Sequence, residues 1–186
     1  FIPMDEYDLQ NAVPIWGVEQ GKNYALVIST NAGLWRYLIG DTIAFTNTKP
    51  YRFKITGRTS QFLNTFGEEL IIDNTDKALS IACQKTNSNV LEYTVAPIYM
   101  QSQKKGGHEW IIEFESAPKN LDFFTYALDD ALKSVNSDYE AKRFKDMALQ
   151  EPKIHLAKKN LFYQWMKNQG KLGRQFKVPR LSNKRT

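Results

Sequence analysis

Three short segments of the sequence combine residue types that could contact a ribose or a phosphate. The first runs from Gly33 to Asp41 and ends in the pair Gly40-Asp41. An aspartate that follows a glycine at a strand end is held out from the sheet edge, where its two oxygens can accept hydrogen bonds from two ribose hydroxyls. Taken alone, the pair is more typical of an ordinary turn between hairpin strands.

The second segment is Ile55 to Gln61, which contains Gly57-Arg58. Glycine lets the backbone bend, and the fixed fork of donors on arginine suits a phosphate or paired ribose oxygens. A surface arginine that merely follows a strand is the plainer interpretation of Arg58.

The third segment is the basic stretch from Gly170 to Arg180, which contains Lys171, Lys177 and the glycines Gly170 and Gly173. A lysine brought to a reacting phosphate stabilises negative charge as it develops in the transition state. A solvated terminus is the commoner fate of such a tail. The apolar residues Phe176, Val178 and Pro179 instead predict that the segment packs against the fold.

Other chemically active residues have simpler explanations. His108 and His155 are isolated, and without a nearby cysteine or second histidine they predict no metal site. Neighbouring residues diverge on a helix, so Asp129-Asp130 predicts a solvated face. We interpret Cys83 as a buried helix residue, and Trp35 as an aromatic packed in a barrel rather than stacked on adenine.

The elements that must position these residues change type along the chain. Residues 24–30, 34–38, 42–46 and 51–56 predict strands joined by short turns, with Gly40-Asp41 at a corner between two of them. After Gly57-Arg58 the pattern predicts alternating elements: a short strand at 61–66, a helix from an Asp73 cap to Lys85, strands at 90–100 and 109–115, and helices after Asn120, over 137–148 and over 159–169. Pro97 marks the first of the two later strands as an edge strand or a bent strand.

The expected fold class is therefore α+β. We expect a β-rich segment over residues 1–58, the remnant of a larger domain's barrel or sheet, followed by a small mobile α+β domain over residues 59–186. The boundary falls near residues 57–61, and the first residue, Phe1, predicts a fragment of a longer protein.

Composition narrows the class of protein. Hydrophobic residues make up 42% and aromatic residues 13%, as in a folded globular chain, and the sequence contains neither a bilayer-length apolar run nor a signal-peptide pattern. A lone cysteine suits a reducing compartment, so we expect a cytoplasmic protein that is not membrane-bound. The net charge of +5 comes from the tail after Gly170, which suits a compact anion better than a nucleic acid.

The order of these segments resembles the adenylate-forming superfamily, and more closely its GH3 branch of acyl-acid amido synthetases. Tyr37, Gly40 and Asp41 match the GH3 pattern Tyr-Arg-x-Gly-Asp, in which Leu38 replaces the arginine, and residues 175–180 resemble the C-terminal Gln-x-Lys-x-Pro-Arg pattern. The Ser/Thr-rich phosphate loop of the family is absent from the sequence, and residues 66–69 look more like a bacterial pattern than a plant one.

The resemblance implies an ATP-dependent ligase that adenylates a carboxylic acid and transfers the acyl group to an amine or amino acid. ATP and Mg²⁺ would be bound mainly outside this chain, which alone would be inactive. Asp41, Arg58, Tyr37 and Gly40 would bind the nucleotide, and Lys177, or second Lys171, would act in catalysis. Two alternatives remain: an acyl-CoA ligase of the same superfamily, and a non-catalytic α+β module whose basic tail binds an acidic protein or RNA.

Overall fold

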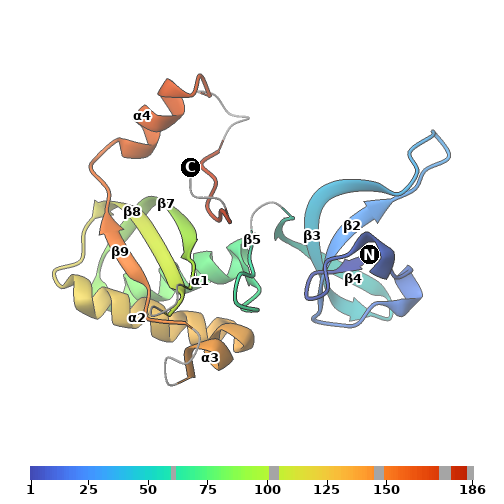
Figure 1. Ribbon diagram of the computed structural model, residues 1–186, viewed down its shortest axis with the longest axis horizontal. Helices are drawn as coiled ribbons and strands as arrows, with labels where there is room; N and C mark the ends of the chain where they lie inside the picture. The colour runs from blue at the N-terminus through green and yellow to red at the C-terminus, as the bar shows by residue number, and fades with distance from the viewer. Residues whose placement is uncertain (60–61, 101–104, 145–148, 172–176, 184–186) are drawn as a thin grey trace. The chain divides into compact units, whose positions relative to one another are not determined.

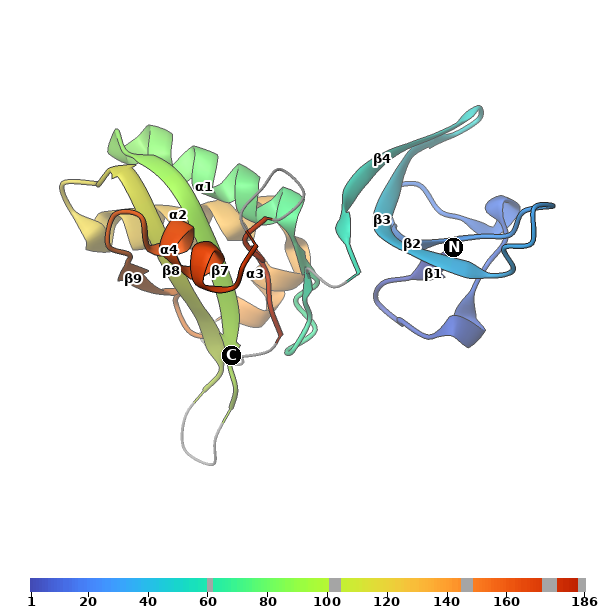
Figure 2. The ribbon, with the colours of Figure 1, turned by 90° about the horizontal axis from the view of Figure 1, so that it is seen from above.

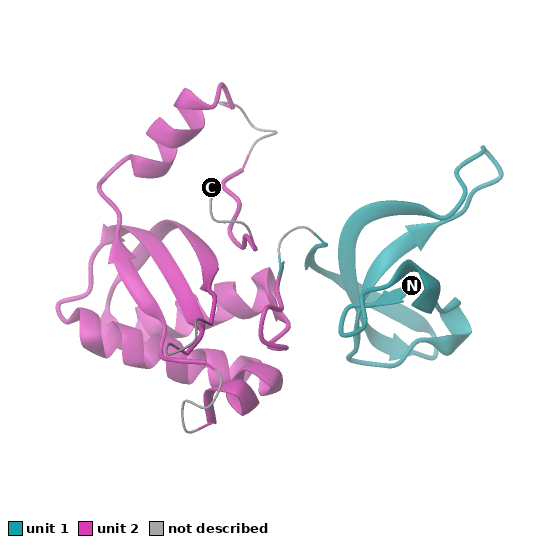
Figure 3. Cartoon of the chain, viewed as in Figure 1, with its two compact units in different colours: residues 1–62 teal, residues 63–186 magenta. Residues whose placement is uncertain are grey.

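The computed structural model describes residues 1–59, 62–100, 105–144, 149–171 and 177–183. They form two compact units, residues 1–62 and residues 63–186, which Figure 3 distinguishes by colour. The first unit is built on strands and the second mixes helices with a sheet, so the predicted α+β class is confirmed.

The first unit contains one antiparallel sheet of four strands in the order β1-β2-β3-β4 (Figure 2). Two short 3-10 helices, η1 (Leu9–Asn11) and η2 (Ile15–Gly17), lie between the first two strands in the sequence. The strands are β1 (Ile2–Pro3), β2 (Asn23–Ile28), β3 (Tyr37–Thr48) and β4 (Tyr51–Arg58). The sheet is held by aromatic packing around Phe45, which is 1% exposed and packs edge-on against Phe1 and Tyr24.

One prediction for this sheet is wrong. The two strands predicted at 34–38 and 42–46 are one strand, β3, which begins only at Tyr37, and Gly40-Asp41 lies inside it rather than at a corner. The pairing of β3 with β2 shifts register beside Gly40, between the pairs Val27–Leu38 and Ala25–Thr42. A β-bulge lets the strand bend without ending, and Gly40 takes the required positive φ of 91°.

The second unit is built on a three-stranded sheet in the order β7-β8-β9. Strand β7 (Asn89–Ile98) pairs antiparallel with β8 (Gly107–Ser116), and β8 pairs parallel with β9 (Lys153–Leu156). The position of β7 at the end of this order agrees with the edge strand predicted from Pro97. The β9 strand was not predicted, because four mostly exposed residues carry no alternating pattern.

Helices cover both faces of this sheet. Figures 1 and 2 show α1 (Ile72–Thr86) and α2 (Leu121–Val135) on one side and α4 (Leu161–Asn168) on the other. The larger core lies between the sheet and the first two helices, where Trp110, Phe124 and Leu128 are 0% exposed. The short helix α3 (Ser137–Arg143) follows α2, and residues 145–148 of the predicted 137–148 helix lie outside the described residues. Two short strands, β5 (Phe62–Leu63) and β6 (Leu70–Ile71), pair just before α1.

Helix starts were predicted with mixed success. The Asn120 side chain accepts a hydrogen bond from the Phe123 amide at 3.0 Å, as expected for the cap of α2. The predicted Asp73 cap of α1 is wrong, because α1 begins after Ile71 and Asp73 lies in its first turn. A carboxylate in the first turn still stabilises the helix through its interaction with the helix dipole. In the part of the chain that the structure describes, no helix is both long and apolar enough to cross a membrane.

Candidate functional site

Asp41 and Arg58, which the sequence placed in separate motifs, lie opposite each other on neighbouring strands. They are register partners of β3 and β4, and Nε of Arg58 lies 3.2 Å from Oδ1 of Asp41. The Arg58 side chain is 63% exposed and that of Asp41 26%. A carboxylate has about four acceptor positions, so one contact with arginine leaves room for ribose hydroxyls.

Gly40 fixes the backbone next to this pair. Its carbonyl accepts a hydrogen bond from the Thr59 amide at 2.9 Å, and the Thr59 hydroxyl lies 3.4 Å from the same oxygen. The contact ties the end of β4 to the bend in β3 and thereby sets the place of Asp41. Tyr37, the other predicted nucleotide contact, is 52% exposed at the start of β3. Residues 60–61 of the Gly-Arg motif lie outside the described residues.

Trp35 does not pack inside a barrel, so that prediction is wrong. The side chain is 81% exposed, in the loop before β3. Its neighbour Arg36 has a φ of 48° and donates a hydrogen bond from Nη2 to the Leu9 carbonyl at 2.8 Å. The turn at Arg36 therefore presents Trp35 to solvent.

The two candidate lysines belong to the second unit. Lys171 and Lys177 are both exposed, and residues 172–176 between them lie outside the described residues. The Lys171 amide donates to the Met166 carbonyl at 2.9 Å, which ties Lys171 to the end of α4. Their meeting with Asp41 and Arg58 around one nucleotide stays a prediction.

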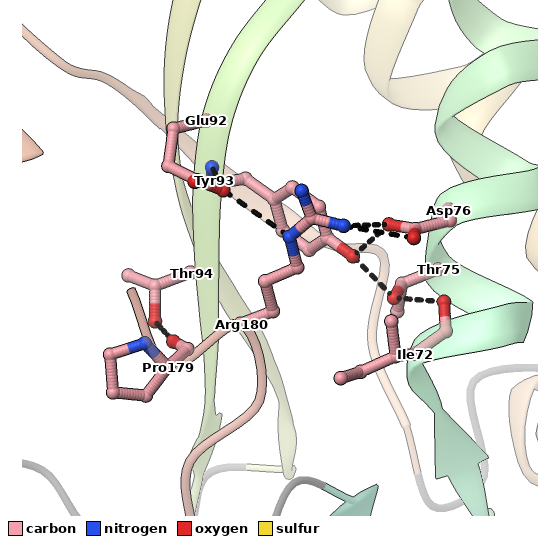
Figure 4. A network of polar contacts seen from close by, with 8 residues as sticks. All are labelled: Ile72, Thr75, Asp76, Glu92, Tyr93, Thr94, Pro179 and Arg180. Atoms are coloured by element: carbon pink, nitrogen blue, oxygen red, sulfur yellow. Dashed lines mark hydrogen bonds and ion pairs between the residues drawn. The ribbon is translucent and has the colours of Figure 1, made fainter. Parts of the chain in front are cut away.

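The tail after Lys177 packs on the fold, as its apolar residues predict. Leu181 is 0% exposed, and Val178 and Pro179 line a mainly apolar cavity of about 450 Å³ with Trp165 of α4. Arg180 lies over the Tyr93 ring and forms ion pairs with Asp76 and Glu92 (Figure 4). Sequence reasoning gave Arg180 only as part of a motif and missed its partners, because they lie far from it in the sequence.

Two polar pairs are buried, and the first contradicts the prediction of a solvated face at Asp129-Asp130. Asp129 is 3% exposed rather than solvated, and its oxygens accept hydrogen bonds from Nε and Nη2 of Arg143, both at 2.7 Å. His108 is 1% exposed in β8, and its Nε2 lies 2.9 Å from Oε1 of the buried Glu68. Burial alone would raise the pKa of Glu68, but the hydrogen bond and charge of His108, with two backbone amides, lower it overall.

Cys83 lies in α1 but is half-buried rather than buried. It lines a more polar cavity of about 470 Å³ together with Asp76 and Arg180. Within the described ranges, no group of three or more His, Cys, Asp or Glu side chains could hold a metal ion.

Comparison with known proteins places both units in one family. The GH3 family central domain matches residues 1–58, and the GH3 family C-terminal domain matches residues 73–186. An indole-3-acetic acid-amido synthetase, GH3.3 of Arabidopsis thaliana, is 29% identical over 97% of this chain and 32% of its own length. A 4-substituted benzoates-glutamate ligase, GH3.12 of the same plant, is 26% identical over 97% of this chain and 34% of its own length.

Solved structures agree at the level of the fold. The GH3.15 acyl acid amido synthetase superposes with a TM-score of 0.66 at 22% identity, over 92% of this chain and 33% of the other. A 2-hydroxyisobutyryl-CoA ligase superposes with a TM-score of 0.52 at 16% identity, over 90% of this chain and 33% of the other. The chain thus spans about a third of the length of the relatives it matches. Because the two domain matches together cover most of its residues, the chain belongs to the GH3 family.

Proposed function

We propose that the chain is the central and C-terminal part of an ATP-dependent acyl-acid amido synthetase. In the first step a substrate carboxylate attacks the α-phosphorus of ATP, and pyrophosphate leaves. In the second step an amine or amino acid attacks the acyl carbon, and AMP leaves. Family membership and the names of the relatives, which join indole-3-acetic acid or benzoates to an amino group, support this reaction class.

The observation that carries the proposal is the pairing of Asp41 with Arg58 at 3.2 Å. Asp41 would accept hydrogen bonds from the ribose hydroxyls, and Arg58 would approach the ribose or the phosphates. Gly40 would hold the bend beside them, and Tyr37, at the start of the same strand, would border the nucleotide.

A lysine from the second unit would complete adenylation. Lys177 is the first candidate for stabilising the charge that develops on the α-phosphate, and Lys171 is the second. We place the hinge between a β-rich part, residues 1–58, and a mobile part, residues 59–186. A swing about residues 58–61 would let one site serve both half-reactions.

Mg²⁺ would accompany ATP and be held mainly by protein outside this chain. The single cysteine supports a cytoplasmic enzyme. A bacterial source, inferred from residues 66–69, stays a prediction beside the plant relatives reported above.

The decisive experiment measures pyrophosphate release by the complete enzyme, meaning the full-length protein that carries this sequence, against a panel of carboxylic acids. Amino acids and coenzyme A are then supplied separately. We expect acid-dependent pyrophosphate release and an amide product. A thioester product would favour an acyl-CoA ligase, and the absence of release with every acid would favour a binding module.

A further inference from the structure

The end of the chain lies along the outer edge of β7. The Val95 amide donates to the Arg180 carbonyl at 2.8 Å, and the Ser182 amide donates to the Val95 carbonyl at 3.0 Å. The Thr94 hydroxyl adds a hydrogen bond of 2.6 Å to the Pro179 carbonyl. These contacts extend the sheet by a short parallel segment, residues 179–182, which we call the strap.

Arg180 joins the strap to two other elements (Figure 4). Its Nη1 donates to both carboxylate oxygens of Asp76 in α1, at 3.0 and 2.9 Å, and its Nε donates to Oε1 of Glu92 in β7 at 3.3 Å. The guanidinium carbon also lies 5.1 Å from the centre of the Tyr93 ring. One side chain thus links the strap, a helix and a strand.

A second layer of contacts holds the Asp76 carboxylate in place. The Tyr93 hydroxyl donates to Oδ1 of Asp76 at 2.6 Å and lies 2.7 Å from the Thr75 hydroxyl. Burial, helped by the hydrogen bond to Asp76, raises the pKa of Tyr93 well above its ordinary value, so the phenol remains a donor. Asp76 therefore presents both oxygens to Arg180 in a fixed orientation.

The exposure of these side chains limits how much the Arg180 contacts stabilise the fold. The side chains of Arg180, Asp76 and Glu92 are 36%, 45% and 26% exposed, and a single exposed ion pair stabilises a protein by only about 0–1 kcal/mol. A network with two carboxylates and a ring is stronger than one pair, and the neighbouring Leu181 is fully buried. Arg180 should therefore tighten the strap rather than hold it alone.

The chain before Lys171 is also held on the second unit, as the strap after Lys177 is. Helix α4 precedes it, and the buried Glu113 carboxylate of β8 accepts a hydrogen bond of 2.6 Å from the Asn160 amide at the start of that helix. Fixed backbone therefore lies on both sides of the segment. Lys177 and Arg180 are three positions apart in the sequence, which limits their Cα atoms to about 10 Å apart.

We propose that Arg180 is a positioning residue for Lys177: it holds the strap on β7 and α1, so that the Lys177 ammonium is carried to the nucleotide by a fixed anchor. This role rests on the proposed function, since it assumes that Lys177 acts in adenylation. An anchor close to Lys177 in the chain restricts the volume that the lysine side chain can sample. This restriction increases the fraction of time that the side chain spends in reach of its target.

Amide exchange in the 186-residue chain tests the anchor without any activity. In Arg180→Ala we expect the Val95 and Ser182 amides to exchange about tenfold faster, because local opening becomes easier. Arg180→Lys should fall between the two, since an ammonium lacks the fork that reaches both carboxylates. The matched control is Lys77→Ala, which removes another exposed ion pair of α1 and should leave both amides unchanged.

Unchanged exchange at both amides in a folded Arg180→Ala protein would overturn the anchor. If that variant does not fold, Asp76→Asn and Glu92→Gln weaken the same contacts from the other side. With these two variants, faster exchange would support the anchor and unchanged exchange would overturn it.

A mutant cycle in the complete enzyme tests the link to Lys177. We expect Arg180→Ala to lower the kcat of pyrophosphate release about tenfold with little change in KM for ATP, and to add no loss when Lys177→Ala is already present. An equal loss in both backgrounds would overturn the positioning role. Normal adenylation by Lys177→Ala alone would instead remove the lysine from the proposed function, and the exchange result would still report on the anchor.

Discussion

Asp41 and Arg58 are directly opposite one another across the β3–β4 ladder, with Nε and Oδ1 3.2 Å apart. The pair joins two motifs that are separate in the sequence, and it lies beside the bend at Gly40. An exposed ion pair of this kind contributes little to folding. Arg58 is the last residue of β4, whereas Asp41 lies inside β3. The binding role of the pair stays a proposal, which the next prediction tests.

Asp41→Ala in the complete enzyme should impair the use of ATP far more than folding. Loss of hydrogen bonds to a charged group predicts a fall of about tenfold to a hundredfold in kcat/KM for ATP, measured by pyrophosphate release. The free energy of unfolding should change by no more than about 1 kcal/mol. The control is Asp5→Ala, which removes another exposed carboxylate of the same unit that pairs with Lys22. Normal pyrophosphate release by folded Asp41→Ala would show that Asp41 does not bind the ribose.

Lys177→Ala should block adenylation in the same assay. Removing one group that stabilises transition-state charge typically lowers kcat by about 100-fold to 1,000-fold. Lys171→Ala should have a much smaller effect if the ranking of the two lysines is right. Acyl-adenylate formation at the parent rate in Lys177→Ala, with a large loss in Lys171→Ala, would reverse the assignment.

Local patterns in the sequence predicted the helices well. The stripe of Phe124, Leu128 and Leu132 is fully buried, and Asn120 caps the helix that carries it. Both features depend on residues a few positions apart, which a sequence displays directly. The bend at Gly40 was harder to predict, because a glycine-aspartate pair is as typical of a turn as of a bulge within a strand. Only the pairing of β3 with β2 reveals the bulge.

Contacts between distant segments could not be predicted in this way. Asp129 looked solvated because a pair of aspartates on a helix usually is, but α3 brings Arg143 and Tyr139 against it. The partners of Arg180, on β7 and α1 of the same unit, lie 88 and 104 residues away in the sequence. Adjacency of this kind depends on the chain topology, which local spacing does not encode.

The Asp129–Arg143 pair makes a testable contribution to stability. Removing one partner of a buried ion pair usually costs about 3–5 kcal/mol, so Asp129→Ala should destabilise the second unit by roughly this amount at neutral pH. Urea unfolding followed by the fluorescence of the buried Trp110 would measure the loss. Asp130→Ala is the matched control, because the neighbouring carboxylate pairs with Lys85 on the surface and should matter little.

The same carboxylate makes stability depend on pH. Burial alone would raise the pKa of Asp129, but hydrogen bonds from Arg143, Lys133 and Tyr139 outweigh it and hold the pKa below the ordinary value of 3.8. Its contribution is therefore complete above that value and is lost as the pH falls through the lower pKa of the folded state. The parent chain should lose stability in this acid range, and Asp129→Asn should lack that part of the loss. Identical acid profiles for the two proteins would contradict the expectation.

Two adjacent glycines offer a final test of packing. A Cβ built on Gly106 would lie 2.3 Å from the Phe66 ring, whereas one built on Gly107 would meet nothing closer than 3.9 Å. Phe66 is partly buried against the core and its ring centroid lies 6.3 Å from that of His108, so a displaced ring would press on the core or on the buried Glu68–His108 pair. Gly106→Ala should therefore destabilise the second unit by about 1–3 kcal/mol, and Gly107→Ala should be close to neutral. Equal midpoints of urea unfolding for the two variants would mean that Phe66 yields at no cost.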